Sequence, residues 1–207
     1  PLSSAQKRLF IIDRINPKST VYNMSGAVIL EGSLEIERLE AAFQTLIERH
    51  DSLRTSFHMI NGQAVQRVEE EFVFKMDYRE KEKDQLGPEL VKEFIRPFDL
   101  SQAPLLRVRG IKLDAEEHLL LYDMHHIISD GTSLIILLNE VMKIYDGRQL
   151  SPLTIQYKDF AHWQNNLKEE MESQEKYWLE RFGDQLPTLN LPTDYPRPKE
   201  QSFKGDS

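Results

Sequence analysis

Two adjacent histidines are the residues of this 207-residue sequence best suited to chemistry. His125 and His126 come just after the apolar run LLLY, within the segment MHHIISDG, which also holds Asp130 and Gly131. Successive side chains of a strand point to opposite sides, so only one of the two rings can face the space in front of a following helix. An imidazole titrates near pH ~6.5 and can therefore exchange a proton at neutral pH.

The same segment is a poor candidate for a metal site. The two rings point apart, no cysteine is present, and no H-E-x-x-H pattern supplies ligands at helical spacing. The structural alternative for a histidine near a strand end is a buried, hydrogen-bonded packing residue, and for the pair both interpretations stay open. The remaining histidines are interpreted as structural: His50, His58, His118 and His162.

Asp130 and Gly131 add a second feature to the histidine pair. Glycine permits a sharp turn from strand to helix, and an aspartate just before a helix caps it or pairs with a cation that braces the loop. Either arrangement sets the imidazoles beside an electropositive helix start. The motif therefore predicts an imidazole that can exchange a proton, placed between the end of a buried strand and the start of the next helix.

Alternating strands and helices must position this motif. The sequence predicts a helix after Ser3, a strand over 22–32, a helix over 35–50 and a hairpin turning at Asn61-Gly62. A further strand is predicted over 71–78, with Phe72, Phe74 and Met76 on one face.

The second half of the chain continues this pattern. A helix over 88–95 is followed by strands over 104–114 and 118–125, which a short loop joins as a hairpin. The apolar segment 132–147 is predicted to be a well-buried helix capped by Thr132 or Ser133 and ended by Gly147. More helix is expected over 156–183. The fold class is therefore α/β (α+β), with hairpins and helices laid against one sheet.

Composition narrows the functional classes. Apolar residues make up 40% of the chain, charged residues 29%, and the net charge is -8 without a basic block, which argues against nucleic acid as a partner. The run LIILL is too short to span a membrane, and PLSSAQKRLF is no signal peptide. The lack of cysteine fits a cytoplasmic protein.

MHHIISDG resembles the HHxxxDG signature of condensation domains in nonribosomal peptide synthetases, within the chloramphenicol acetyltransferase-like superfamily. Further segments resemble that family's motifs in the same order along the chain. They are SSAQKRLF at the start, RHDSLRTSF with Asp51 where glutamate is usual, YKDFAHW, the pair Tyr177-Trp178, and LPTDYPRP. The resemblance extends over nearly the whole chain.

The resemblance implies a chloramphenicol acetyltransferase-like lobe, a mixed, largely antiparallel sheet covered by helices. Residues 1–183 would be the N-terminal lobe of a condensation domain, and residues 184–207 an extended, proline-rich linker leading to a missing C-terminal lobe. The family domain is roughly twice as long, with its active site in a tunnel between two lobes. This chain lacks the later F-V-N-T motif, so the isolated lobe is expected to be inactive.

The resemblance also implies a reaction: the amine of an acceptor aminoacyl thioester attacks a donor acyl or peptidyl thioester. Phosphopantetheine arms of carrier proteins would hold both substrates, and no cofactor, metal or nucleotide would bind the domain directly. His126 would be the general base or would position the amine, and the N–H of Gly131 would help to polarise the carbonyl. His125, Asp130 and Arg54 would be structural residues of the active site, with Asp130 paired to an arginine of the missing lobe.

Three further residues are interpreted as structural. Arg49, like Arg54, is expected to form an ion pair that holds the hairpin to the core. Gln6 is expected to be structural as well, and Tyr157 to be a packing residue.

The opening SAQKRL resembles domains that join an L-configured donor to an L-configured acceptor. Three alternatives stay open: a non-catalytic module that docks carrier proteins, a starter-type condensation domain that takes a fatty acyl donor, and a free-standing acyltransferase that uses CoA. The intact HHxxxDG pattern favours catalysis, and the linker-like tail favours a piece of a multimodular synthetase of antibiotic biosynthesis. The expected partners are carrier proteins, the missing lobe and adjacent synthetase domains.

Overall fold

The computed structural model describes residues 1–81, 87–183, 188 and 190–196. The chain divides into two compact units, Pro1–Asn165 and Asn166–Ser207. The family resemblance places the end of the lobe at residue 183, whereas the two units are defined by contacts between residues. The boundary at residue 183 therefore stays a prediction. Both histidines of the motif lie in the first unit.

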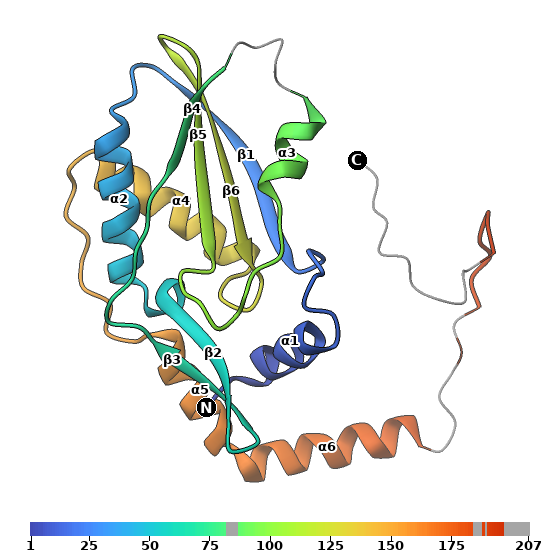
Figure 1. Ribbon diagram of the computed structural model, residues 1–207. Helices are drawn as coiled ribbons and strands as arrows, with labels where there is room; N and C mark the ends of the chain where they lie inside the picture. The colour runs from blue at the N-terminus through green and yellow to red at the C-terminus, as the bar shows by residue number, and fades with distance from the viewer. Residues whose placement is uncertain (82–86, 184–187, 189, 197–207) are drawn as a thin grey trace. The chain divides into compact units, whose positions relative to one another are not determined.

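Helices and strands alternate along the chain as the sequence predicts (Figure 1). The helices are α1 (Ser4–Ile15), α2 (Ile36–Arg49), the 3-10 turn η1 (Asp51–Arg54), α3 (Pro88–Phe94), α4 (Gly131–Tyr145), α5 (Tyr157–Asn166) and α6 (Lys168–Phe182). The strands are β1 (Asn23–Glu31), β2 (Thr55–Ile60), β3 (Gln63–Val68), β4 (Asp77–Glu80), β5 (Leu106–Asp114) and β6 (Glu117–His125).

The main sheet has the strand order β1-β6-β5-β4, and only β4 and β5 run parallel. The mixed, largely antiparallel sheet is therefore confirmed. β6 is flanked on both sides, because Asn23 of β1 pairs with His125 and Leu106 of β5 pairs with Met124. β6 thus lies between β1 and β5 (Figure 1), and it pairs with β1 up to His125, its last residue, and with β5 up to Met124.

Residues of opposite parity on β5 and β6 face different layers. Leu120 and Met124 of β6 belong to the large core that also contains buried residues of α2 and α4. Leu121 instead packs with Leu90 and Phe94 of α3. The sheet therefore has an α2/α4 face and an α3 face, and neighbouring residues at the end of β6 fall on different faces.

The two-residue turn between β2 and β3 forms as predicted. Asn61 and Gly62 both have positive φ, 51° and 77°, the combination that a tight hairpin with this twist requires. The hairpin forms a separate two-stranded sheet, and the carbonyl of Arg54, just before β2, accepts the N–H of Glu69, just after β3, at 2.9 Å.

Two predictions about secondary structure are wrong. The strand predicted over 71–78 begins only at Asp77, although Met76 is buried and Phe72 and Phe74 pack against the same core. Their alternation reflects burial of one side of an extended segment without strand pairing. Alternating apolar residues report which side is buried and do not by themselves require a neighbouring strand.

The prediction that the helix after the motif is well buried is also wrong. In α4 only Leu137 and Val141 are buried, while Ile135 is 63% and Ile136 47% exposed. Of the caps that the sequence offers, Asp130 is the N-cap, rather than Thr132 or Ser133. An apolar surface on α4 is thus left open in this chain.

In the second unit, α6 carries a ladder of aromatic side chains. The rings of Trp178 and Phe182 stack at 5.7 Å and 17°, and Tyr177 meets Trp178 edge-on. Across the described ranges, none of the helices combines the length and the apolar character needed to cross a membrane.

Candidate active site

The backbone of the histidine pair is held beyond the last ladder of β6. The N–H of His125 donates to the carbonyl of Leu105 at 3.1 Å, and the N–H of His126 donates to the carbonyl of Tyr22 at 2.8 Å. Segments on both sides of β6 therefore fix the position from which each ring projects.

His125 lies inside the protein, on the α3 face. It is 4% exposed, its Nδ1 accepts the N–H of Ile127 at 3.1 Å, and its ring meets Phe98 edge-to-face. Burial, with a smaller contribution from the charge of His126, lowers the pKa of His125 to about 4. The ring is therefore neutral at pH 7, which suits the scaffold role predicted for it.

A buried ion pair lies next to His125 on the same face. The carboxylate of Asp123, 0% exposed, accepts hydrogen bonds from Asn23 at 2.9 Å, Ser25 at 2.9 Å and Arg107 at 3.0 Å. Burial raises the pKa of Asp123 and these donors oppose the rise. The guanidinium of Arg107 also lies 3.6 Å from the ring centre of Phe98. This network joins β1, β5 and β6 at the end that carries the motif.

His126 has the opposite surroundings. It is exposed, and its Nδ1 lies 2.8 Å from the carbonyl oxygen of Ser129. A carbonyl oxygen only accepts, so Nδ1 carries the hydrogen. In the neutral ring Nε2 then keeps a lone pair and can accept a proton or a hydrogen bond.

His126 lines a cavity of about 210 Å³ at the start of α4. The lining residues come from α1, from the loop after β6 and from the starts of α4 and α5: Ala5, Gln6, Leu9, His126, Ile127, Ile128, Ser129, Asp130, Ser133 and Tyr157. Sequence reasoning treated Gln6 and Tyr157 as structural only. Their membership of the motifs SSAQKRLF and YKDFAHW was the available signal, because these motifs meet at this cavity. The hydroxyls of Ser3 and Tyr157 lie 2.9 Å apart and join the two elements.

Asp130 begins α4. Its Oδ1 accepts the N–H of Ser133 at 2.8 Å and the hydroxyl of Ser133 at 2.6 Å, and these bonds lower the pKa of Asp130. Its observed role is thus a helix cap, and no ion pair of Asp130 is found in the described part of the chain. Likewise, no three histidine, aspartate or glutamate side chains among those residues are grouped to hold a metal.

Gly131 is the first residue of α4, and the turn before it does not need glycine. Its φ lies outside the positive range, and a Cβ added there would meet nothing within 4 Å. The turn into α4 therefore does not depend on the conformational freedom of glycine. Open space above this residue is left for another group to approach the start of α4.

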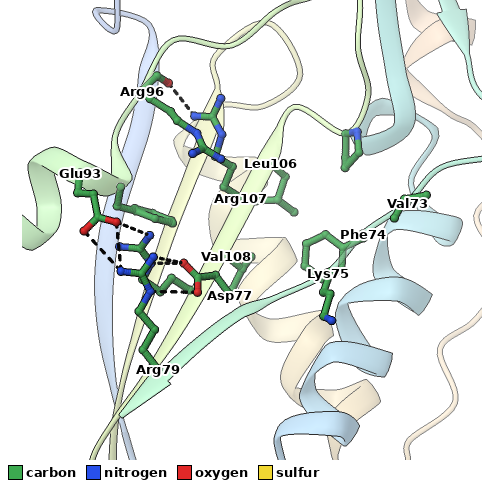
Figure 2. A pocket seen from close by; sticks show the side chains of 13 residues that line it. Val73, Phe74, Lys75, Asp77, Arg79, Glu93, Arg96, Leu106, Arg107 and Val108 are labelled. Carbon is green, nitrogen blue, oxygen red and sulfur yellow. Dashed lines mark hydrogen bonds and ion pairs between the residues drawn. The ribbon is translucent and has the colours of Figure 1, made fainter. Parts of the chain in front are cut away.

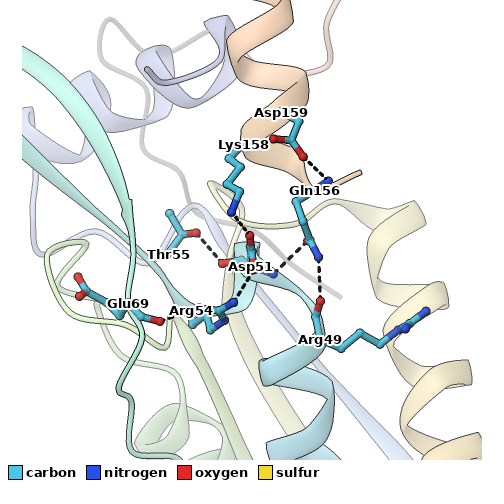
Figure 3. A network of polar contacts seen from close by, with 8 residues as sticks. All are labelled: Arg49, Asp51, Arg54, Thr55, Glu69, Gln156, Lys158 and Asp159. Atoms are coloured by element: carbon cyan, nitrogen blue, oxygen red, sulfur yellow. Dashed lines mark hydrogen bonds and ion pairs between the residues drawn. The ribbon is translucent and has the colours of Figure 1, made fainter. Parts of the chain in front are cut away.

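Arg54 lies in a polar network apart from the His126 cavity (Figure 3). It pairs with Asp51 at 2.5 Å and donates to the carbonyl of Glu69 at 2.9 Å, while Lys158 pairs with the other oxygen of Asp51 at 2.6 Å. Arg54 thus ties η1 to the end of β3, and Lys158 ties η1 to α5. Because α5 begins with Tyr157, the network fixes one wall of the cavity from behind.

Gln156 extends this network toward α2. Its side chain accepts the N–H of Asp51 at 3.1 Å and donates to the carbonyl of Arg49 at 2.9 Å (Figure 3). The guanidinium of Arg49 pairs with Glu140 of α4 at 3.0 Å, so the prediction that Arg49 holds the hairpin to the core is wrong. Arg49 instead joins α2 to α4.

Solved structures share this arrangement of strands and helices. The X-domain from teicoplanin biosynthesis, solved in complex with OxyB, is 26% identical, with a TM-score of 0.83 over 96% of this chain and 46% of its own. The starter condensation domain of rhizomide synthetase is 22% identical, with a TM-score of 0.76 over 89% of this chain and 48% of its own. The fold is therefore the chloramphenicol acetyltransferase-like fold of condensation domains.

The chain belongs to the Condensation domain family, whose sequence model matches residues 1–207. It is 52% identical over 207 residues to gramicidin S synthase 2 of Brevibacillus brevis, and 52% identical over 208 residues to tyrocidine synthase 3 of Brevibacillus parabrevis. These alignments cover 99% and 100% of this chain but 5% and 3% of the relatives. The chain thus spans a small part of large peptide synthases.

Proposed function

We propose that residues 1–183 are the N-terminal lobe of a condensation domain that forms amide bonds in a nonribosomal peptide synthetase, and that residues 184–207 lead to its second lobe. The amine nitrogen of an acceptor aminoacyl thioester attacks the carbonyl carbon of a donor acyl thioester. A C–N bond forms, the C–S bond breaks, the amine loses a proton, and the donor sulfur leaves as a thiol. Carrier proteins present both thioesters on phosphopantetheine arms.

The observation that carries this proposal is the tautomer of His126. With Nδ1 donating to the carbonyl of Ser129 at 2.8 Å, Nε2 can take the amine proton or orient the amine by accepting a hydrogen bond. The ring lines a cavity at the start of α4, where backbone N–H groups and the helix dipole favour negative charge. The N–H of Gly131 belongs to this first turn and would stabilise the developing oxyanion.

The second lobe would complete the site. The two solved neighbours are about twice as long, since this chain covers 46% and 48% of them. The exposed Ile135 and Ile136 of α4 form a surface that a second lobe would cover. We therefore expect the 207-residue chain alone to show no transfer between loaded carrier proteins, and detectable amide formation by it would contradict this.

The direct test joins this chain to a second lobe and measures single-turnover transfer between loaded carriers. His126→Ala should lower the rate by about 10²–10⁴-fold. His162→Ala, which changes an exposed histidine of α5, should leave the rate within twofold. Transfer near the parent rate in His126→Ala would reject a chemical role for His126. It would favour a docking module, a role for which the X-domain neighbour, solved with OxyB, is a precedent.

The same assay tests the donor class. We propose an L-configured aminoacyl or peptidyl donor and an L-configured acceptor. Carriers loaded with L-aminoacyl, D-aminoacyl and fatty acyl groups should be compared at equal concentration. Faster transfer of the fatty acyl group would identify a starter-type domain instead.

A further inference from the structure

A second cavity, of about 340 Å³, lies at the edge of β5 (Figure 2). β4 pairs with β5 only from Arg109 to Lys112, so the first residues of β5, from Leu106 to Val108, border open space instead of a strand. Five cationic side chains line this space: Lys75, Arg79, Arg96, Arg107 and Arg109. Among the residues that the structure describes, two acidic residues line it with them, Asp77 and Glu93.

Two of the arginines are neutralised within the cavity. Nε of Arg109 lies 2.7 Å from Asp77, and Arg79 pairs with Asp77 at 3.1 Å and with Glu93 at 3.1 Å. Although burial alone would raise it, hydrogen bonds from Arg79 and Arg109 lower the pKa of Asp77. These four side chains form a closed, neutral cluster, which Figure 2 shows around Asp77 and Glu93.

The other cations are not neutralised by cavity residues. Arg107 pairs with Asp123, outside the lining, and no ion pair of Arg96 or Lys75 is found in the ranges that the structure describes. Burial first, and the charge of Arg96 in addition, lower the pKa of Arg107. Five cations therefore meet three carboxylates, with an excess of two positive charges.

A buried donor is also left over. Arg109 has a side chain that is 6% exposed, and its Nη1 has no hydrogen-bond partner among the residues that the structure describes. An unpaired buried donor of a charged group costs free energy that a bound acceptor would recover. The excess charge and this donor belong to residues that line one cavity, and both favour the binding of an anion.

We propose that this cavity binds a phosphoryl group. A phosphate carries up to two negative charges, which matches the excess, and its oxygens suit guanidinium groups. The volume leaves room for a group attached to the phosphate. Arg107 and Arg109 lie on the α3 face, whereas the His126 cavity is built from α1, α4 and α5. The site is thus separate from the one proposed for amide formation, and its test does not depend on transfer activity.

Calorimetric titration of the 207-residue chain with pyrophosphate at low ionic strength tests this proposal. We expect saturable binding at one site, weakened by added salt. The double substitution Lys75→Ala/Arg96→Ala removes two exposed cations and should weaken binding about tenfold or more. Arg148→Ala, which changes an exposed arginine paired with Asp146, should leave binding within twofold.

A second titration, with 4′-phosphopantetheine, separates the sources of the phosphoryl group. Tighter binding than pyrophosphate would assign the site to a carrier-bound arm, and weaker binding would assign it to a free phosphorylated molecule. The proposal is overturned if neither compound gives saturable binding. It is also overturned if the double variant binds the two compounds as tightly as the parent does, while circular dichroism shows that variant and parent are folded.

Discussion

The two sides of the sheet at the end of β6 differ in how far their titratable side chains are exposed to solvent. On the α3 face, His125 and Asp123 are buried, and Asp123 receives three hydrogen bonds. One residue further along, His126 is exposed and has an internal partner at Nδ1. The position one step beyond the strand thus changes an imidazole from a packed ring into an accessible one.

This difference separates support from chemistry. The buried carboxylate of Asp123 cannot take up a proton without disturbing the three hydrogen bonds it accepts, whereas Nε2 of His126 keeps a lone pair available. Rigid backing nevertheless serves catalysis, because a small displacement of a positioned group lowers the rate strongly. The α3 face would therefore contribute to the reaction only through the position of the strand end.

Removing the buried carboxylate should give the largest loss of stability. Asp123→Ala leaves Arg107, Asn23 and Ser25 without their shared acceptor, and breaking a buried pair in this way costs about 3–5 kcal/mol. Urea unfolding measures this loss. Asp146→Ala breaks an exposed pair with Arg148 and should cost less than about 1 kcal/mol. Similar losses in the two variants would remove the contrast between buried and exposed pairs.

His125 should make stability depend on pH. Its folded pKa is lowered to about 4 from an unfolded value of about 6.5, so the unfolded chain takes up the proton first as pH falls. The stabilisation is therefore complete above pH ~6.5 and is lost progressively between pH ~6.5 and ~4. Between pH 7.5 and pH 5 the expected loss is about 2 kcal/mol.

Urea unfolding of the parent and of His125→Gln at these two pH values checks this expectation. The variant should lose most of the dependence, whereas His162→Gln, at an exposed position of α5, should keep it. An equal pH dependence in the parent and in His125→Gln would show that another group titrates instead.

The sequence was sufficient for the elements whose signals are local. The positive φ values of Asn61 and Gly62 follow from the residue types, and the antiparallel pairing of β5 with β6 follows from the predicted hairpin. That the two histidines would have different surroundings follows from strand alternation alone. That His125 is the structural one was predicted from the family resemblance, whereas the packing of Phe98 against its ring is a contact that no local pattern specifies.

Predictions that depended on distant partners were wrong more often. The apolar composition of α4 indicated a buried helix, yet Ile135 and Ile136 are exposed. Composition shows that a helix surface is suited to packing, but it does not show whether this chain supplies the surface that would cover it. Arg49 was assigned to the hairpin but pairs with Glu140 of α4. Tyr157 reaches the His126 cavity through the network around Asp51, which joins residues more than one hundred positions apart in sequence.

Gly131 gives the smallest expected change in stability and separates fold from function most directly. Alanine there meets nothing within 4 Å and begins a helix, so Gly131→Ala should unfold at the same urea concentration or stabilise the chain by less than about 1 kcal/mol. If a substrate carbonyl approaches the start of α4, the added methyl group should lower transfer by the completed domain about tenfold or more. Gly147→Ala should behave in the opposite way, because Gly147 has φ 78° and alanine there costs about 1 kcal/mol at a site outside the cavity. Unchanged transfer in Gly131→Ala would mean that the start of α4 receives no substrate group, and the oxyanion would then need a donor from the second lobe.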